Sequence, residues 1–187
     1  GFARTGQAFF GFARHGIVPD MITMGKPMGN GIPISGLAAK EDVLAAFSDK
    51  LPYFNTFGGN PVSIAAAQAV LKYIKDENLQ EHCKKAGAAL LKALKEVQER
   101  HPESVGDVRG AGLFLGFEFV KNDGNKTPDK DMALNVIEML RDEHILTSVI
   151  GHYGNILKLR PPMVFSENDI DWFATSLDKC ITKLENK

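Results

Sequence analysis

Apolar residues recur at the spacing of a helix face over residues 79–100, the longest regular pattern in the chain. Pro102 follows this pattern and predicts where the helix ends. The apolar positions of this face are Leu79, Cys83, Ala86, Leu90, Leu94 and Val97. The same spacing over shorter lengths predicts helices at residues 41–47, 64–74, 132–144 and 166–185. Ser166 is the expected N-cap of the last helix, and Asn60 and Ser63 are candidate caps for the helix over 64–74.

Apolar runs bounded by turn residues predict strands between these helices. The runs are residues 20–24, 32–39, 108–120, 145–150 and 155–162. From about residue 78 onward helices and strands alternate, which predicts a compact α/β domain over residues 78–187, preceded by a piece of another domain over 1–77. We expect the long helix to pack on a small sheet made by residues 112–120, 145–150 and 155–160.

Composition and charge exclude several classes of function. The formal net charge of −1, from 22 basic and 23 acidic residues, offers no footprint for nucleic acid or an anionic membrane surface. No apolar run approaches the roughly 18 residues of a membrane span. Cys83 and Cys180 stand outside any CxxC or His-rich cluster, so we expect no disulfide framework and no metal site. A cytoplasmic protein acting on small molecules or other proteins fits best.

One lysine lies in unusual surroundings. Residues 22–31 read ITMGKPMGNG, so Lys26 follows an expected strand and is surrounded by glycines and a proline. In one interpretation Lys26 is a solvated lysine in a strand connection, with the glycines serving the turn. In the other, a lysine on a rigid strand end with little bulk around it reaches an aldehyde and forms a Schiff base. These residues alone leave both interpretations open.

Five motifs in order then change the picture. They are GFARTG (1–6), PDMITMGKPMGNGIPISG (19–36), YFNTFGGNPVSIAAAQAVL (53–71), GDVRGAGLFLGFEFV (106–120) and LKLRPPMVFSENDID (157–171). In this order and spacing they resemble the C-terminal half of class III aminotransferases, pyridoxal-phosphate enzymes of fold type I, over nearly the whole chain. The sequences KPMGNG (26–31) and NTFGGNPVS (55–63) are most similar to those of one branch of the family. This branch contains alanine-glyoxylate aminotransferase 2 and the phospho-lyases that act on phosphoethanolamine and phosphohydroxylysine.

The resemblance implies roles for particular residues. Lys26 would form the Schiff base with pyridoxal 5'-phosphate and then move the substrate proton. Thr56 would reach the cofactor phosphate of the neighbouring subunit, which implies a homodimer with a shared active site; an ordinary loop threonine is the alternative. Arg160 would pair with a substrate carboxylate, or face a phosphate in a phospho-lyase, or be solvated. Arg4 is interpreted as structural, and Phe9, Phe10 and Phe12 as packing residues.

The resemblance also implies what the chain lacks. It assigns residues 1–77 to the C-terminal part of the cofactor-binding large domain and 78–187 to the small domain. GFARTG opens without an initiator methionine, and the family's aspartate for the pyridine nitrogen belongs upstream of Gly1. We therefore expect a fragment with little or no catalysis of its own, whose strands over 20–24 and 32–39 lack sheet neighbours.

Three functions remain. The first is an aminotransferase that moves an amino group from an amino acid or amine to a keto acid. The second is a phospho-lyase that eliminates phosphate and ammonia from a phosphorylated amine. The third is a folded fragment without catalysis. The sequence does not identify the amino donor or the acceptor.

Overall fold

The computed structural model describes residues 1–186 and divides them into two compact units. Unit 1 contains residues 1–3 and 8–80, and unit 2 contains residues 4–7 together with those from 81 onward. Residues 4–7, which include the last three residues of the opening motif, therefore belong to a different unit from the residues on either side of them. Both units carry helices and strands, in agreement with the mixed fold expected from the sequence.

Unit 1 is built around a two-stranded antiparallel sheet. Strand β1 (Met21–Met24) pairs with β2 (Gly36–Ala39), so that Met21 lies opposite Ala39 and Met24 opposite Gly36. The predicted strand over 32–39 is thus shorter than expected, because Pro33 has no N–H to donate and Ile32 instead closes a turn onto the Gly29 carbonyl at 3.1 Å. The other elements are η1 (Gly11–His15), η2 (Lys26–Met28), α1 (Glu41–Ser48) and α2 (Pro61–Asp76).

Helix α2 begins where its capping residues predict. The Asn60 side chain accepts hydrogen bonds from the backbone N–H groups of Val62 and Ser63 at 3.0 and 3.2 Å. Pro61 occupies the first helical position, where a missing N–H costs nothing. Asn60 is therefore the N-cap. Ser63, the second candidate, lies inside the helix, because the chain already becomes helical at Pro61.

The buried interior of unit 1 is small. Its buried apolar residues are Phe2, Ala3, Ala67, Ile74 and Leu79. Phe9 lies edge-on to Phe10, and Phe10 stacks on Phe12 with ring centroids 5.3 Å apart, which agrees with the packing role expected of these aromatics. Much of the remaining apolar surface of the unit faces outward, most of all Val18 and the aromatic residues before and after Asn55.

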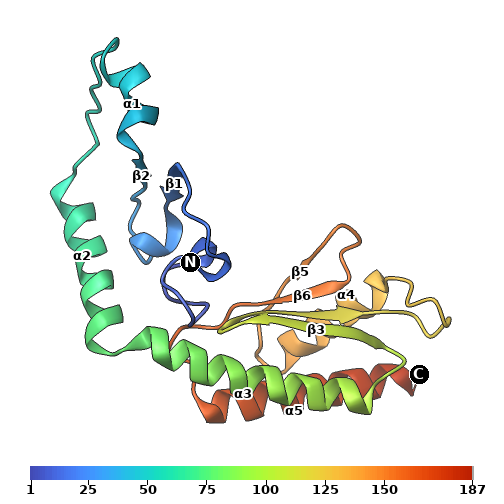
Figure 1. The fold of residues 1–187 in the computed structure, drawn as a ribbon. Helices are drawn as coiled ribbons and strands as arrows, with labels where there is room; N and C mark the ends of the chain where they lie inside the picture. The colour runs from blue at the N-terminus through green and yellow to red at the C-terminus, as the bar shows by residue number, and fades with distance from the viewer. Residues whose placement is uncertain (187) are drawn as a thin grey trace. The chain divides into compact units, whose positions relative to one another are not determined.

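Unit 2 is a four-stranded antiparallel sheet covered on one face by helices. The strand order is β3 (Val105–Ala111), β4 (Phe114–Phe119), β6 (Ile156–Leu159) and β5 (Val149–Ile150). Figure 1 shows α3 (Leu79–Arg100) and α5 (Glu167–Glu185) side by side along the same face of this sheet. The third helix, α4 (Lys130–Asp142), contacts both α5 and the strands β4, β5 and β6.

The predicted strand over 108–120 is wrong in one respect, since it is a hairpin. Gly112 adopts a φ of +53°, in the left-handed region, and the chain reverses there between β3 and β4. A second difference concerns residues 145–150, of which only Val149 and Ile150 pair in the sheet. Ile145 instead donates its backbone N–H to the Leu140 carbonyl at the end of α4.

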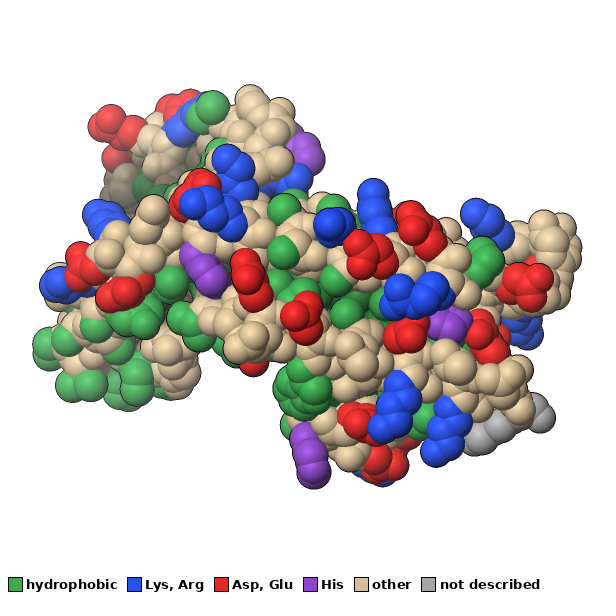
Figure 2. Space-filling view, turned by 90° about the horizontal axis from the view of Figure 1, so that it is seen from below, with side chains coloured by type: hydrophobic (Ala, Val, Ile, Leu, Met, Phe, Trp, Pro, Cys, Tyr) green, Lys and Arg blue, Asp and Glu red, His purple; other side chains and the backbone are tan. Residues whose placement is uncertain are grey.

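The core of unit 2 confirms the predicted face of the long helix. All six apolar positions of that face are buried, with Cys83, Leu94 and Val97 fully enclosed. The five from Cys83 to Val97 belong with Phe117, Leu157 and other alternate residues of the strands to one hydrophobic cluster, whereas Leu79 lies in unit 1. Each fully buried aliphatic or aromatic side chain contributes about 1.5–3 kcal/mol relative to exposure. On the outer side of α3 and α5, basic and acidic side chains are interspersed without a patch of one sign (Figure 2).

A buried histidine ties the ends of α3 and α5 together. His101 Nδ1 lies 2.7 Å from a Glu185 carboxylate oxygen, and its Nε2 lies 3.1 Å from Asp178. Arg100 donates to the same Asp178 at 2.7 Å, and the Ser104 hydroxyl donates to Glu185 at 2.6 Å. The buried polar side chain is thus fully partnered, as its low exposure requires.

Candidate functional site

Lys26 lies directly after β1 in a strained backbone conformation. It opens the short helix η2 with a φ of +43°, a left-handed value that costs a non-glycine residue about 1–3 kcal/mol. The strain is held by neighbours on both sides. Pro27 has a fixed φ, the Met28 N–H donates to the Gly25 carbonyl at 3.1 Å, and the Gly29 N–H donates to Lys26 at 3.4 Å. Strain of this kind is typical of functional positions.

The glycines around Lys26 have different roles. A Cβ at Gly29 would lie 2.1 Å from the Ile32 carbonyl oxygen, so this glycine is required by a close approach of backbone. A Cβ at Gly31 would meet nothing within 4 Å, and one at Gly25 would meet only ordinary contacts. Gly29 therefore holds the turn together, while Gly31 borders open space next to the lysine.

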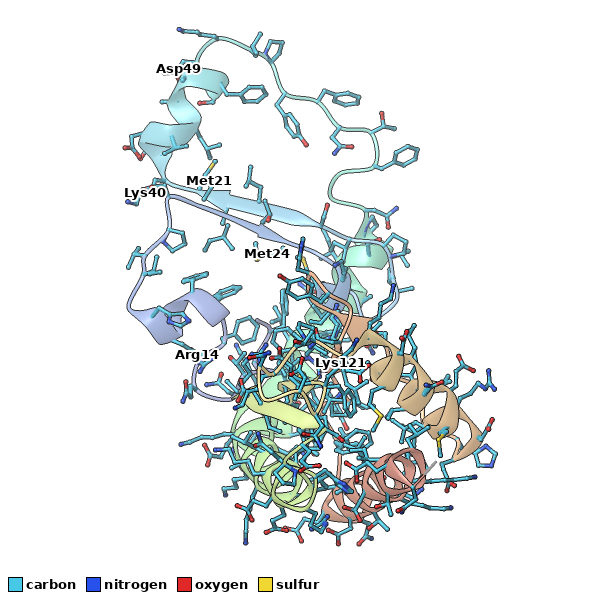
Figure 3. The ribbon with its side chains drawn as sticks, turned by 90° about the vertical axis from the view of Figure 1, so that its right-hand side faces the viewer. Arg14, Met21, Met24, Lys40, Asp49 and Lys121 are labelled. Atoms are coloured by element: carbon cyan, nitrogen blue, oxygen red, sulfur yellow. The ribbon has the colours of Figure 1, made fainter. Side chains whose placement is uncertain are left out.

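The Lys26 side chain is exposed and, among residues 1–186, takes part in no hydrogen bond or ion pair. The other lysine of this small sheet differs, because Lys40 pairs with Asp20 at 2.7 Å. Figure 3 shows Lys40 at the end of the β1–β2 ribbon near Met21, with Met24 at the opposite end, next to Lys26 in the chain. Helix η2 also contacts α2, so the turn that carries Lys26 packs against a helix.

Thr56 sits in the middle of a turn between α1 and α2. The Asn55 side chain accepts hydrogen bonds from the backbone N–H groups of Phe57 and Gly58 at 3.1 and 3.0 Å, which fixes the backbone around Thr56. Within the described part of the chain the hydroxyl and the N–H of Thr56 have no hydrogen-bond partner. Tyr53, Phe54 and Phe57 beside it are 73–85% exposed.

Arg160 belongs to unit 2 and lies at the end of β6. It is exposed and borders a groove of about 500 Å³. Lys158 and His144 add polar groups to the lining of this groove, and Phe165 and Trp172 add aromatic surface. Of the three residues expected at a site, Lys26 and Thr56 are therefore in unit 1 and Arg160 is in unit 2.

Arg4 was expected to be structural, and its partners are now identified. Its Nη1 donates to the Pro161 carbonyl at 2.5 Å and to the Leu113 carbonyl at 3.3 Å. Burial lowers the pKa of the Arg4 guanidinium, the nearby Cys83 thiol opposes this shift, and the Arg160 guanidinium adds to it. The sequence alone did not predict that Arg4 contacts the segment after Arg160. The only signal for such a contact was Pro161–Pro162, because prolines have no N–H for sheet pairing and their carbonyls need other donors.

Other kinds of site find no support in residues 1–186. No group of three His, Cys, Asp or Glu residues there could hold a metal ion. Cys83 and Cys180 are free and buried, and burial raises the pKa of both thiols. Helices long and apolar enough to cross a bilayer are likewise absent from that part of the chain.

Comparison with known proteins gives consistent matches. The family described as aminotransferase class-III matches residues 1–181. The chain is 43% identical over 185 residues to ethanolamine-phosphate phospho-lyase homolog 1 of Caenorhabditis elegans, covering 97% of this chain and 39% of that protein. It is 39% identical over 184 residues to alanine–glyoxylate aminotransferase 2 homolog 2, mitochondrial, of Arabidopsis thaliana, covering 98% of this chain and 38% of that protein.

Solved structures agree with these relatives. A phospholyase from Arthrobacter in complex with phosphoethanolamine superimposes with a TM-score of 0.93 at 38% identity, covering 97% of this chain and 43% of that one. In each case the chain spans about two fifths of the length of the protein it matches.

Proposed function

Since the chain belongs to the class III aminotransferases, we propose that it forms part of a pyridoxal-phosphate-dependent enzyme that moves an amino group from an amino acid or amine to a keto acid. The family membership and the fold type I architecture confirm what the five motifs predicted. The observation that carries the proposed activity is the strained, unpaired Lys26 at the end of β1. Left-handed backbone at a non-glycine residue is enriched at functional positions, and here it coincides with an exposed amine that makes no ion pair.

The residues present fit the cofactor. Lys26 offers an amine without a partner among residues 1–186, and Gly31 next to it borders open space. Thr56 offers a hydroxyl and a backbone N–H held in place by the Asn55 turn. Pyridoxal phosphate, when bound, supplies an aldehyde and an electron-withdrawing ring.

The lysine amine has two tasks in this proposal. Nζ of Lys26 would hold the cofactor through the aldehyde that the cofactor supplies, and would give way to a substrate amine. Nζ would then serve as the base that takes up the proton of the substrate α-carbon and gives it up again. The backbone hydrogen bonds of the turn from Gly25 to Gly29 fix the position of the Cα from which this side chain extends.

We further propose a homodimer in which Thr56 binds the cofactor phosphate of the partner subunit. The loop that carries Thr56 exposes the large apolar side chains of Tyr53, Phe54 and Phe57, and this supports an interaction surface here. Arg160 is proposed to pair with the substrate carboxylate. The assignments of 1–77 to the large domain and 78–187 to the small domain, and a cytoplasmic location, stay predictions.

A phospho-lyase is the second candidate, because the relative at 43% identity carries that name and the Arthrobacter structure contains phosphoethanolamine. Both activities use the same lysine, so product analysis distinguishes them. Free phosphate and ammonia from phosphoethanolamine indicate the lyase, whereas a new amino acid from a keto acid indicates the aminotransferase. The polypeptide in hand could also fold without catalysis, which the same assays would detect as an absence of both products.

Our first prediction tests Lys26 directly. Pyridoxal phosphate is added to the chain, the absorbance spectrum is recorded, and borohydride reduction followed by peptide mapping locates the covalent adduct. We expect a yellow band and an adduct on Lys26, both lost in Lys26→Ala. Lys40→Ala, at the other end of the same sheet, is the matched control and keeps both. An adduct spread over surface lysines, or none in the wild type, would contradict cofactor binding by this chain.

A further inference from the structure

The segment after Arg160 is held by side chains rather than by the sheet. Residues 161–165 read PPMVF, and the two prolines have no N–H with which to continue the β6 ladder. Their carbonyls still need partners. Side chains from two other parts of unit 2 provide them at alternate residues, the carbonyls of Pro161, Met163 and Phe165.

Three residues make these contacts, and we call them the carbonyl clasp: Arg4, His82 and Cys83. Arg4 Nη1 lies 2.5 Å from the Pro161 oxygen, and His82 Nε2 lies 3.1 Å from the Phe165 oxygen. The Cys83 sulfur lies 3.8 Å from the Met163 oxygen, a weak contact. Only Arg4 acts on the residue directly after Arg160, and it does so with a charged donor, which is the stronger kind.

Arg4 reaches this position because its own backbone is closely fitted into unit 2. The Leu113 N–H donates to the Arg4 carbonyl at 3.0 Å. A Cβ on Gly112 would lie 2.4 Å from that carbonyl oxygen, and a Cβ on Gly6 would lie 2.6 Å from the Lys84 Cα. Both glycines also have left-handed φ values, +53° and +75°. A side chain at either position is therefore disfavoured by the backbone conformation as well as by the close contact. Arg4 is thus held both at its backbone and at the end of its side chain.

The positive charges of Arg4 and Arg160 also influence each other. The Arg4 side chain is half-buried, and its pKa is lowered by burial and further by the positive charge of Arg160. Two neighbouring positive charges favour an anion next to them, because a bound carboxylate offsets their repulsion. Arg4 therefore has two effects near Arg160: it fixes the adjacent backbone, and it adds to the positive potential.

We propose that Arg4 is a positioning residue for the substrate-carboxylate site: by holding the Pro161 carbonyl it fixes the backbone beside Arg160 and so aims the Arg160 guanidinium at the carboxylate. This inference rests on the proposed function of Arg160. It gives the arginine of the opening GFARTG motif a role in substrate selection, although that motif lies 157 residues from Pro161 in the chain.

The test uses the complete cofactor-loaded protein that contains this chain. Rates of the first half reaction are measured with alanine, which has a carboxylate, and with isopropylamine, which has none. We expect Arg4→Met and Arg160→Met each to raise the KM for alanine about tenfold, with kcat and the KM for isopropylamine changed less than about twofold. The double variant should be no worse than Arg160→Met alone, because both act through one guanidinium.

Arg109→Met is the matched control. Arg109 is also in the unit 2 sheet, but it pairs with Asp107 and Glu118 on β3 and β4, so its loss should leave both KM values unchanged. Hydrogen exchange of the peptide covering residues 157–166 gives a readout independent of activity. It should be faster in Arg4→Met and unchanged in Arg160→Met. If Arg4→Met does not fold, Arg4→Lys, which keeps the charge without the fork, replaces it and should show the same substrate-specific loss.

Two outcomes overturn the proposal, and they differ. If Arg160→Met leaves the KM for alanine unchanged, the proposed function of Arg160 fails and the positioning role fails with it. If Arg160→Met raises that KM but Arg4→Met does not, or impairs both substrates equally, only the positioning role of Arg4 is overturned.

Discussion

At the scale of single residues, a close approach of backbone can outweigh local preference. Gly87 lies inside α3, where alanine favours the helix by about 1 kcal/mol. Yet a Cβ on Gly87 would lie 2.2 Å from the backbone of Gly112, at the turn between β3 and β4. The pattern of the helix predicts its face correctly but contains no information about this contact, because Gly112 is distant in the chain.

We therefore predict that Gly87→Ala destabilises unit 2, with a loss of about 1–3 kcal/mol in the free energy of unfolding from overpacking. Urea unfolding followed by circular dichroism measures it. The control Ala89→Gly, exposed on the same helix, should lose only about 1 kcal/mol. A Gly87→Ala variant as stable as the wild type would contradict the close packing of α3 against the turn at Gly112.

At the scale of elements, capping predicts where helices begin. Ser166 was expected to cap α5, and a full capping box is present there, which confirms it. The Asp169 carboxylate accepts from the Ser166 hydroxyl at 2.7 Å and from its N–H at 2.8 Å. These bonds lower the pKa of the Asp169 carboxyl below its ordinary value of 3.8.

A pH dependence follows from the direction of that shift. Because the pKa of Asp169 is lower in the folded chain, its ionised carboxylate stabilises α5 at pH values above 3.8. This contribution is lost as the pH falls through the pKa of the folded chain. We predict that the urea midpoint of the wild type exceeds that of Asp169→Asn at pH 6, and that the gap closes as the pH falls below 3.8 and through the lowered pKa of the folded chain. Asp171→Asn, which changes an exposed carboxylate two residues further along α5, is the control and should show no such gap. A gap that persists in acid would contradict this account.

Strands were harder to predict than helices. Residues 108–120 alternate like one strand, yet they form β3 and β4 because Gly112 is left-handed and packs against Arg4 and Thr5. Residues 145–148 are apolar enough for a strand, but after α4 ends the chain first bonds to Leu140. It reaches β6 through bonds of Thr147 and Ser148 to Lys158, and its strand pairing begins at Val149. In both places the deciding partner is remote in sequence.

At the scale of the whole molecule, the core is unevenly distributed. The large hydrophobic cluster lies entirely in unit 2, whereas unit 1 buries five apolar residues and exposes many more. Stability follows buried apolar area, so the two units should differ in their resistance to unfolding. Among the described residues, β1 and β2 pair only with each other.

We predict that urea unfolds the chain in two steps, with unit 1 lost first. Trp172, the single tryptophan of the sequence, lies in α5 of unit 2, so its fluorescence reports that unit alone. Far-UV circular dichroism should begin to change before the fluorescence does. Leu94→Ala, which removes about 2–5 kcal/mol from the unit 2 core, should shift only the later step. Coincident transitions by both probes would contradict the prediction.

The sequence by itself determined the family, the helices and their buried faces, the caps at Asn60 and Ser166, and the candidates Lys26, Thr56 and Arg160. These depend on local spacing and on motifs that are contiguous in the chain. Only the tertiary structure decided the β3–β4 hairpin, the left-handed backbone of Lys26 and the bonds from Arg4 to the segment after Arg160. Each of these depends on which backbone groups meet across the fold, and a linear pattern of apolar and polar residues does not encode such meetings.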